Sequence, residues 1–170
     1  MYSIGLDVHA RKINGCILDA NGKRIKEFAL PGDVSLLLFE LQAVEQACQV
    51  CYEASCGYGA LYDRLAQLPN VKRIVVAHPG QLRLIFRSKR KNDRVDARKL
   101  ATLLLLDQVP QAHVPPLDVR AWRAAIEFRG RLVDRQTRVK NQLRAMLRSR
   151  GLAAPMRVQK PLPPSRSRTW

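Results

Sequence analysis

The first thirty residues contain three short runs that suit β-strands, and these runs constrain the fold more than any other feature. Residues 2–10 ("YSIGLDVHA") are apolar and β-branched, while residues 12–20 and 23–30 alternate apolar and polar side chains. Asn21–Gly22 separates the last two runs, and this pair is a strong signal for a hairpin turn. The opening therefore predicts a three-stranded antiparallel meander.

Helical and strand patterns alternate after the meander. Such alternation requires parallel pairing with right-handed crossovers, so the later strands should lie beside the first strand. The predicted order, β-β-β-α-β-α-β-α, is that of an α/β protein with a mixed, ribonuclease H-like sheet. The expected elements are a helix over 34–47, a strand over 48–53, a helix over 57–68, a strand over 71–77, a short helix or turn over 79–89 and a helix over 93–106.

The chain is predicted to divide into a compact domain and an appendage. Residues 1–106 supply the domain, and residues 107–116, with three prolines, are expected to form a linker. Residues 117–150 lack proline and contain only Gly130 as a helix breaker, which predicts one long helix. Residues 151–170 are rich in proline, serine and arginine, a composition typical of a disordered tail.

The long helix carries an apolar stripe with arginines on most other faces. Apolar residues spaced by three, four or seven indicate an incomplete coiled-coil seam. We therefore expect a homodimer or a higher oligomer formed through this helix. The stripe consists of Ala121, Ala125, Phe128, Leu132, Val139, Leu143 and Met146.

The net charge of +16 lies almost wholly in the second half of the chain. Residues 1–82 are neutral overall, whereas residues 83–99 sum to +6 and residues 117–170 to +11. A positive field of this size attracts polyanions, of which nucleic acid is the commonest. A solvated basic surface without a partner is the alternative.

The chain shows no signal for a membrane or for secretion. Its apolar runs, such as "SLLLF", are too short to span a bilayer, and its start lacks the features of a signal peptide. A cytoplasmic, nucleoid-associated protein with reduced thiols is expected. Cys48 and Cys51 form a C-x-x-C pair, but positions three apart on a strand face opposite ways, which disfavours a zinc site.

Four carboxylates are candidate site residues, and each also has a structural explanation. Asp7 lies inside an apolar strand and could cap a turn, and Glu53 ends the predicted fourth strand and could be a solvated terminus. Asp93 and Asp96 stand in the first turn of a predicted helix, where acids suit the helix dipole and can form a cap.

Taken together, the four acids favour a metal site. Asp7 and Glu53 can approach each other if the first and fourth strands are neighbours, and helical spacing turns Asp93 and Asp96 to one side. Converging carboxylates need a compensating cation, and hard divalent ions such as Mg²⁺ or Mn²⁺ prefer oxygen ligands. Two such ions can serve phosphodiester chemistry.

Three motifs resemble those of a known family. "GLDVH", "CYEASCGYG" and "KNDRVDARKLA" together resemble the DEDD transposases of insertion-sequence family one-ten and the related site-specific invertases. The likeness covers roughly residues 2–150 and includes an N-terminal RuvC-like domain. It implies that Asp7, Glu53, Asp93 and Asp96 are the catalytic, metal-binding acids. "EASCGYG" departs from the threonine-glycine pair that usually follows the glutamate.

The resemblance also implies partners and a second domain. Such enzymes carry a domain with a nucleophilic serine after the long helix, and no serine of this chain matches it, so a truncated or frame-disrupted copy or a defined fragment is expected. They work on DNA together with a structured RNA, and the arginine-rich helix is a reasonable RNA contact.

The sequence thus predicts the N-terminal part of a transposase or site-specific recombinase. One alternative is a metal-dependent nuclease or junction resolvase of the same fold, and another is a non-catalytic nucleic-acid-binding remnant. In each case basic residues would hold the phosphate backbone rather than read sequence. The predicted nucleic-acid contacts are Lys89, Arg90, Lys91, Arg94, Arg98, Lys99, Arg131, Arg135, Arg138, Lys140 and Arg144.

Overall fold

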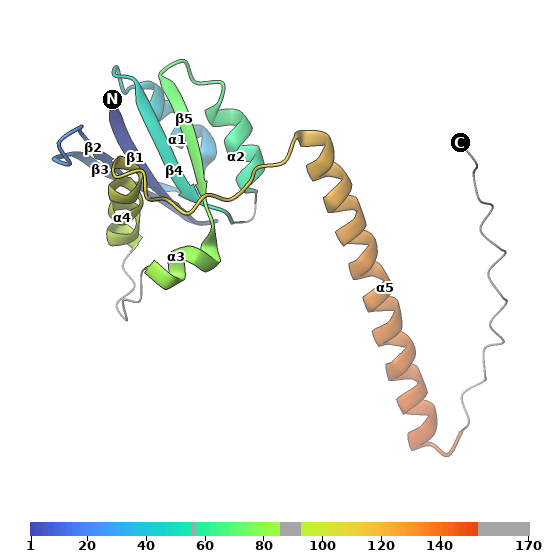
Figure 1. Cartoon of the computed structure of the whole chain (residues 1–170). Helices are drawn as coiled ribbons and strands as arrows, with labels where there is room; N and C mark the ends of the chain where they lie inside the picture. The colour runs from blue at the N-terminus through green and yellow to red at the C-terminus, as the bar shows by residue number, and fades with distance from the viewer. Residues whose placement is uncertain (56, 86–92, 153–170) are drawn as a thin grey trace, which may run out of the picture. The chain divides into compact units, whose positions relative to one another are not determined.

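The computed structural model of the chain describes residues 1–55, 57–85 and 93–152 (Figure 1). The chain divides into two units, residues 1–120 and residues 121–170. Strands and short helices make up the first unit, and the long helix makes up most of what is described of the second. Within the described residues, no helix is both long enough and apolar enough to cross a membrane.

The first unit is built on a sheet to which the described residues contribute five strands in the order β3-β2-β1-β4-β5. β1 pairs antiparallel with β2 and parallel with β4, so β1 is the point at which the sheet changes direction. This order confirms the ribonuclease H-like fold predicted from the sequence. The strands are Tyr2–Val8 (β1), Lys12–Leu18 (β2), Arg24–Pro31 (β3), Cys48–Glu53 (β4) and Val71–Ala77 (β5).

Helices cover both faces of this sheet. On one face, Leu37 and Leu41 of α1 (Val34–Gln42) share a buried cluster with Leu61 and Leu65 of α2 (Tyr58–Leu65). On the other face, α4 (Asp93–Leu105) packs its buried residues against β1, β2 and β4. A short helix, α3 (Pro79–Ile85), follows β5. The sheet is therefore the middle layer of an α/β/α arrangement.

The helix expected over 34–47 is shorter than its sequence pattern suggests. It ends at Gln42, and the Asn70 side-chain amide donates to the carbonyl oxygens of Leu41 in the last turn and of Val44 just beyond it, both at 2.8 Å. These contacts satisfy carbonyl groups at the helix end, and they turn the chain toward the start of β4.

The proline-rich residues 107–116 lie along β5. The Ala112 amide donates to the Val76 carbonyl, and the His78 amide donates to the Pro110 carbonyl, both at 2.7 Å. α5 (Leu117–Ser149) follows and continues through Gly130, as the long helix predicted for 117–150 requires. Its first turn belongs to the first unit, since Arg120 donates to both oxygens of Asp63 on α2 at 2.7 and 2.8 Å.

Candidate active site at the strand ends

Asp7 and Glu53 lie at the carboxyl ends of two neighbouring parallel strands. The register pairs Gly5 with Cys51 and Leu6 with Tyr52, so the next step along both strands brings Asp7 beside Glu53. Because side chains alternate along a strand, both acids project to the face that carries Gly5 and Cys51. Asp7 is 9% exposed and Glu53 is half-buried. The strand register therefore places the backbones of Asp7 and Glu53 next to each other, as the sequence predicted.

α4 lies on the same face and runs opposite to β1. A Cβ atom on Gly5 would lie 2.1 Å from the Ala97 carbonyl oxygen and 2.4 Å from the Ala101 amide nitrogen, so the helix backbone touches the strand. The C-terminal end of α4 is near the β2–β3 turn, where a Cβ atom on Gly22 would lie 3.4 Å from Leu105. The first turn of α4, residues 93–96, consequently lies at the Asp7 end of β1.

The structure describes the side chains of three of the four predicted acids. Asp96 is about one-third exposed, and its Oδ1 lies 3.2 Å from the Lys99 ammonium nitrogen. Asp93 begins α4, but its side chain is outside the described set. Among the residues that are described, no three His, Cys, Asp or Glu side chains come close enough together to hold a metal ion. The four-carboxylate metal site therefore stays a prediction.

His9 is a neighbour of the site that the sequence analysis did not single out. Its Nε2 lies 3.2 Å from Oδ1 of Asp7, and its ring is 58% exposed. His9 reaches Asp7 because the chain turns directly after β1, where His9 and Lys12 exchange backbone hydrogen bonds of 2.9 and 3.3 Å. The only sequence signal was the histidine in "GLDVH", two positions after the aspartate.

The described cysteines of β4, Cys48 and Cys51, are free thiols. Cys48 and Cys51 belong to clusters on opposite faces of the sheet, which confirms the orientation predicted for the C-x-x-C pair. Burial raises the pKa of the Cys51 thiol to about 12. Cys51 is fully buried among apolar side chains of β5 and α4, so the groups that the described residues of this face offer to a cation are mainly carboxylate oxygens.

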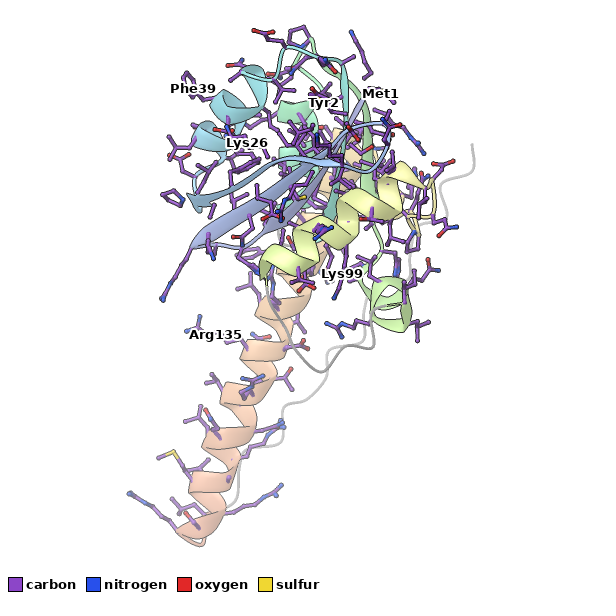
Figure 2. The ribbon with its side chains drawn as sticks, turned by 90° about the vertical axis from the view of Figure 1, so that its left-hand side faces the viewer. Met1, Tyr2, Lys26, Phe39, Lys99 and Arg135 are labelled. Carbon is purple, nitrogen blue, oxygen red and sulfur yellow. The ribbon has the colours of Figure 1, made fainter. Side chains whose placement is uncertain are left out.

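The predicted nucleic-acid contacts fall into two groups. On α4, Arg98 is exposed and Lys99 is half-buried beside Asp96. On α5, Arg131, Arg135, Arg138 and Arg144 are exposed, and Lys140 is partly exposed. Figure 2 labels Lys99 and Arg135 on their two helices. Lys89, Arg90 and Lys91, and the side chain of Arg94, lie outside the described residues.

The strand order 3-2-1-4-5 defines a ribonuclease H-like domain. Acids stand at the ends of β1 and β4, and the first turn of α4, which also carries acids, lies at the same end. This end of the sheet is therefore a candidate carboxylate active site. Residues 4–150 match the model of a transposase family, the DEDD transposases of the IS110 group (insertion-sequence family one-ten). The chain belongs to this family.

Two solved structures from Thermus thermophilus are similar to part of the chain. One is RuvC in complex with a Holliday junction substrate, with 11% sequence identity, a TM-score of 0.46, and coverage of 66% of this chain and 99% of that one. The other is a RuvC structure with 12% identity, a TM-score of 0.45, and coverage of 66% and 100%. No match was found among curated proteins.

Proposed function

We propose that this domain binds one or two Mg²⁺ or Mn²⁺ ions through Asp7, Glu53, Asp93 and Asp96 and performs the phosphodiester chemistry of DNA transposition. The observation that carries this proposal is the placement of Asp7 and Glu53 side by side, at the end of β1 where α4 begins, in a member of a transposase family. When bound, such ions activate an attacking oxygen and stabilise a leaving one.

The available donors fit hard divalent ions. Asp7 is largely withdrawn from water, and a buried carboxylate requires a compensating positive charge or hydrogen bonds. Glu53 brings a second carboxylate to the same strand edge, which increases that requirement. Both acids stand on adjacent hydrogen-bonded strands, so the backbone holds them in place before any ion binds.

The bases would hold nucleic acid against this site. Arg98 and Lys99 lie on the same helix as Asp96, so a phosphate backbone bound there lies beside the carboxylates. The arginines of α5 provide a separate basic surface, for DNA and for a structured RNA partner. Contacts of this kind fix the register of the strand without reading its sequence.

The first prediction concerns metal binding. Mg²⁺ or Mn²⁺ should raise the melting temperature of the wild-type chain, because ligands that bind only the folded state stabilise it. Asp7→Asn and Glu53→Gln should lose most of this shift, because each removes one of the proposed carboxylate ligands. Glu45→Gln, an exposed acid after α1, is the matched control and should keep the shift.

An equal metal-induced shift in all four proteins would show that the site is wrong. Activity provides the second measurement, with donor and target DNA, metal, the candidate RNA and the serine-bearing second domain of the family supplied as a separate chain. Asp96→Asn should abolish strand transfer while leaving DNA binding intact. Efficient cutting of branched DNA by the chain alone, without strand transfer, would instead favour a junction-resolving nuclease.

A further inference from the structure

A pocket lies at the same strand ends, toward the α1 and α2 face of the sheet. It has a volume of about 240 Å³ and sits between the start of α1 and the start of α2. Val8, Val34 and Leu61 give it apolar walls, Tyr58 adds an aromatic ring, and Ser55 and Arg64 supply polar groups.

This pocket is adjacent in sequence to both strand-end acids. Val8 follows Asp7 directly, and Tyr52, which also lines the pocket, directly precedes Glu53. Because consecutive residues of a strand project to opposite faces, the acids lie on the α4 face of the sheet and the pocket on the α1 and α2 face. Both are at the carboxyl ends of β1 and β4. A nucleic-acid strand bound at the acids therefore needs to pass only around these strand ends to reach the pocket.

The pocket is preformed and is electrostatically suited to a polyanion. The buried Tyr52 hydroxyl donates to the Tyr58 carbonyl oxygen at 2.6 Å, which fixes the start of α2. Arg64 is exposed, and its guanidinium donates to the Ser35 hydroxyl at 3.3 Å. The described residues that line the pocket include this arginine and no carboxylate, so a phosphate-bearing ligand meets no repulsion from the lining.

We propose that this pocket receives one unstacked nucleobase of the strand whose backbone is bound at Asp7 and Glu53. Unpaired bases bind proteins by stacking on aromatic rings and by hydrogen bonds to their edges, and this lining supplies a tyrosine ring, apolar walls, an arginine and a serine. The inference rests on the proposed function, since it needs a strand at the acids.

The test separates base binding from phosphate binding with two probes of equal length. One is a single strand of deoxythymidine, and the other has the same backbone with every nucleoside abasic. The wild-type chain should bind the first about tenfold more tightly, which is the scale of one stacked base. Ala60→Trp, an exposed position on the pocket rim, should fill the pocket and remove this preference, and Arg64→Gln should reduce it.

Two control variants match these changes in size and charge. Gln67→Trp adds the same ring just beyond α2, and Lys72→Gln removes one charge at the opposite end of the sheet, and neither residue lines the pocket. Both controls should keep the wild-type preference for bases. If Ala60→Trp keeps it too, the pocket proposal is overturned while nucleic-acid binding stands. If wild type binds neither probe, the proposed function and the pocket fall together.

Discussion

Gly5 decides how closely α4 approaches β1, and through this distance it decides where the first turn of that helix lies. Both atoms that a Cβ at this position would strike belong to the backbone of α4, so no side-chain rotation could relieve the contact. Gly5 lies in β1, two positions before Asp7, and contributes no functional group to the site. Its role is to let α4 come close to the strand.

Gly5→Ala should therefore destabilise the first unit by about 3 kcal/mol or more, the upper range for overpacking, because α4 must move as a whole. It should also weaken metal binding, since the first turn of α4 moves with the helix. Urea unfolding followed by circular dichroism measures the first effect. Gly130→Ala is the opposite case, since nothing lies within 4 Å of a Cβ there, and it should stabilise α5 by roughly 0.5–1 kcal/mol. A Gly5→Ala protein as stable as wild type would contradict the close approach.

The pairing of Asp7 with Glu53 could be predicted from the sequence because strand order alone makes their strands neighbours. His9 and Arg120 could not be identified in this way. His9 reaches Asp7 only through the geometry of a turn, and Arg120 meets Asp63 only because α5 starts beside α2. The Arg120–Asp63 contact joins residues that are distant in sequence, and such a contact leaves no periodic pattern.

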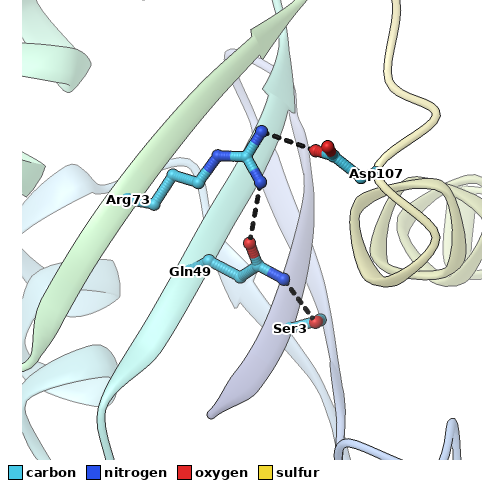
Figure 3. A network of polar contacts seen from close by, with 4 residues as sticks. All are labelled: Ser3, Gln49, Arg73 and Asp107. Carbon is cyan, nitrogen blue, oxygen red and sulfur yellow. Dashed lines mark hydrogen bonds and ion pairs between the residues drawn. The ribbon is translucent and has the colours of Figure 1, made fainter.

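At the scale of elements, a polar network ties the far end of α4 to the sheet (Figure 3). The Gln49 amide donates to the Ser3 hydroxyl at 3.0 Å, and Arg73 donates to Gln49 at 3.4 Å and to Asp107 at 2.6 Å. Asp107 follows α4 with a φ of 54°. The network thus fixes the end of the helix opposite to the candidate site.

The buried half of this network should carry most of its stabilising effect. Ser3 and Gln49 are buried, whereas the Asp107 side chain is 72% exposed. Gln49→Leu leaves the Ser3 hydroxyl without this donor and should cost about 1–3 kcal/mol. Asp107→Asn, which suits the left-handed backbone, should cost less than about 1 kcal/mol. Denaturation midpoints of the two variants test the ranking, and equal losses would contradict it.

In contrast to α4, which packs on the sheet, α5 has no buried residue. Packing rather than propensity stabilises most helices, and this one exposes Phe128, Leu132, Val139, Leu143 and Met146. The sequence predicted its length correctly because it contains no proline, but a pattern of apolar residues does not identify the surface that covers them. We expect a second copy of α5 to do so.

Self-association through α5 can be tested in the full-length chain. Leu132→Lys combined with Leu143→Lys should convert an oligomer to a monomer in sedimentation experiments, since charges do not fit a coiled-coil seam. Thr137→Lys combined with Asn141→Lys adds the same charge on the opposite side of the helix and should leave the oligomer intact. A monomeric wild-type chain would contradict the prediction.

Across the whole molecule, charge is divided between a neutral first half, which holds the sheet with α1 and α2, and a basic second half. Residues 1–82 balance eight acids against eight bases, and residues 117–170 carry a net charge of +11. The sequence alone was enough to assign this charge to the second half of the chain, because charge depends only on which residues a segment contains.

Nucleic-acid affinity should consequently fall steeply as salt rises, because each neutralised phosphate releases a counterion. Replacing Arg131, Arg135, Arg138, Lys140 and Arg144 with glutamine should flatten the slope of log affinity against log salt, by up to roughly 0.9 for each duplex phosphate that the variant no longer neutralises. Metal-induced thermal shifts should not change in this variant. Binding that does not depend on salt would contradict the electrostatic account.

The two edge strands of the sheet, β3 and β5, are protected from pairing with other molecules in different ways. This difference affects how the protein behaves at high concentration. Residues 110–112 occupy part of the open edge of β5 by backbone hydrogen bonds, while β3 carries Arg24, Lys26 and Glu27. Charged side chains on an edge strand discourage strands of other molecules from pairing with it. Cleavage between residues 107 and 116 would release these residues from β5 and expose the backbone hydrogen-bonding groups of its apolar second half, residues 74–77, and such a nicked molecule would be prone to aggregation.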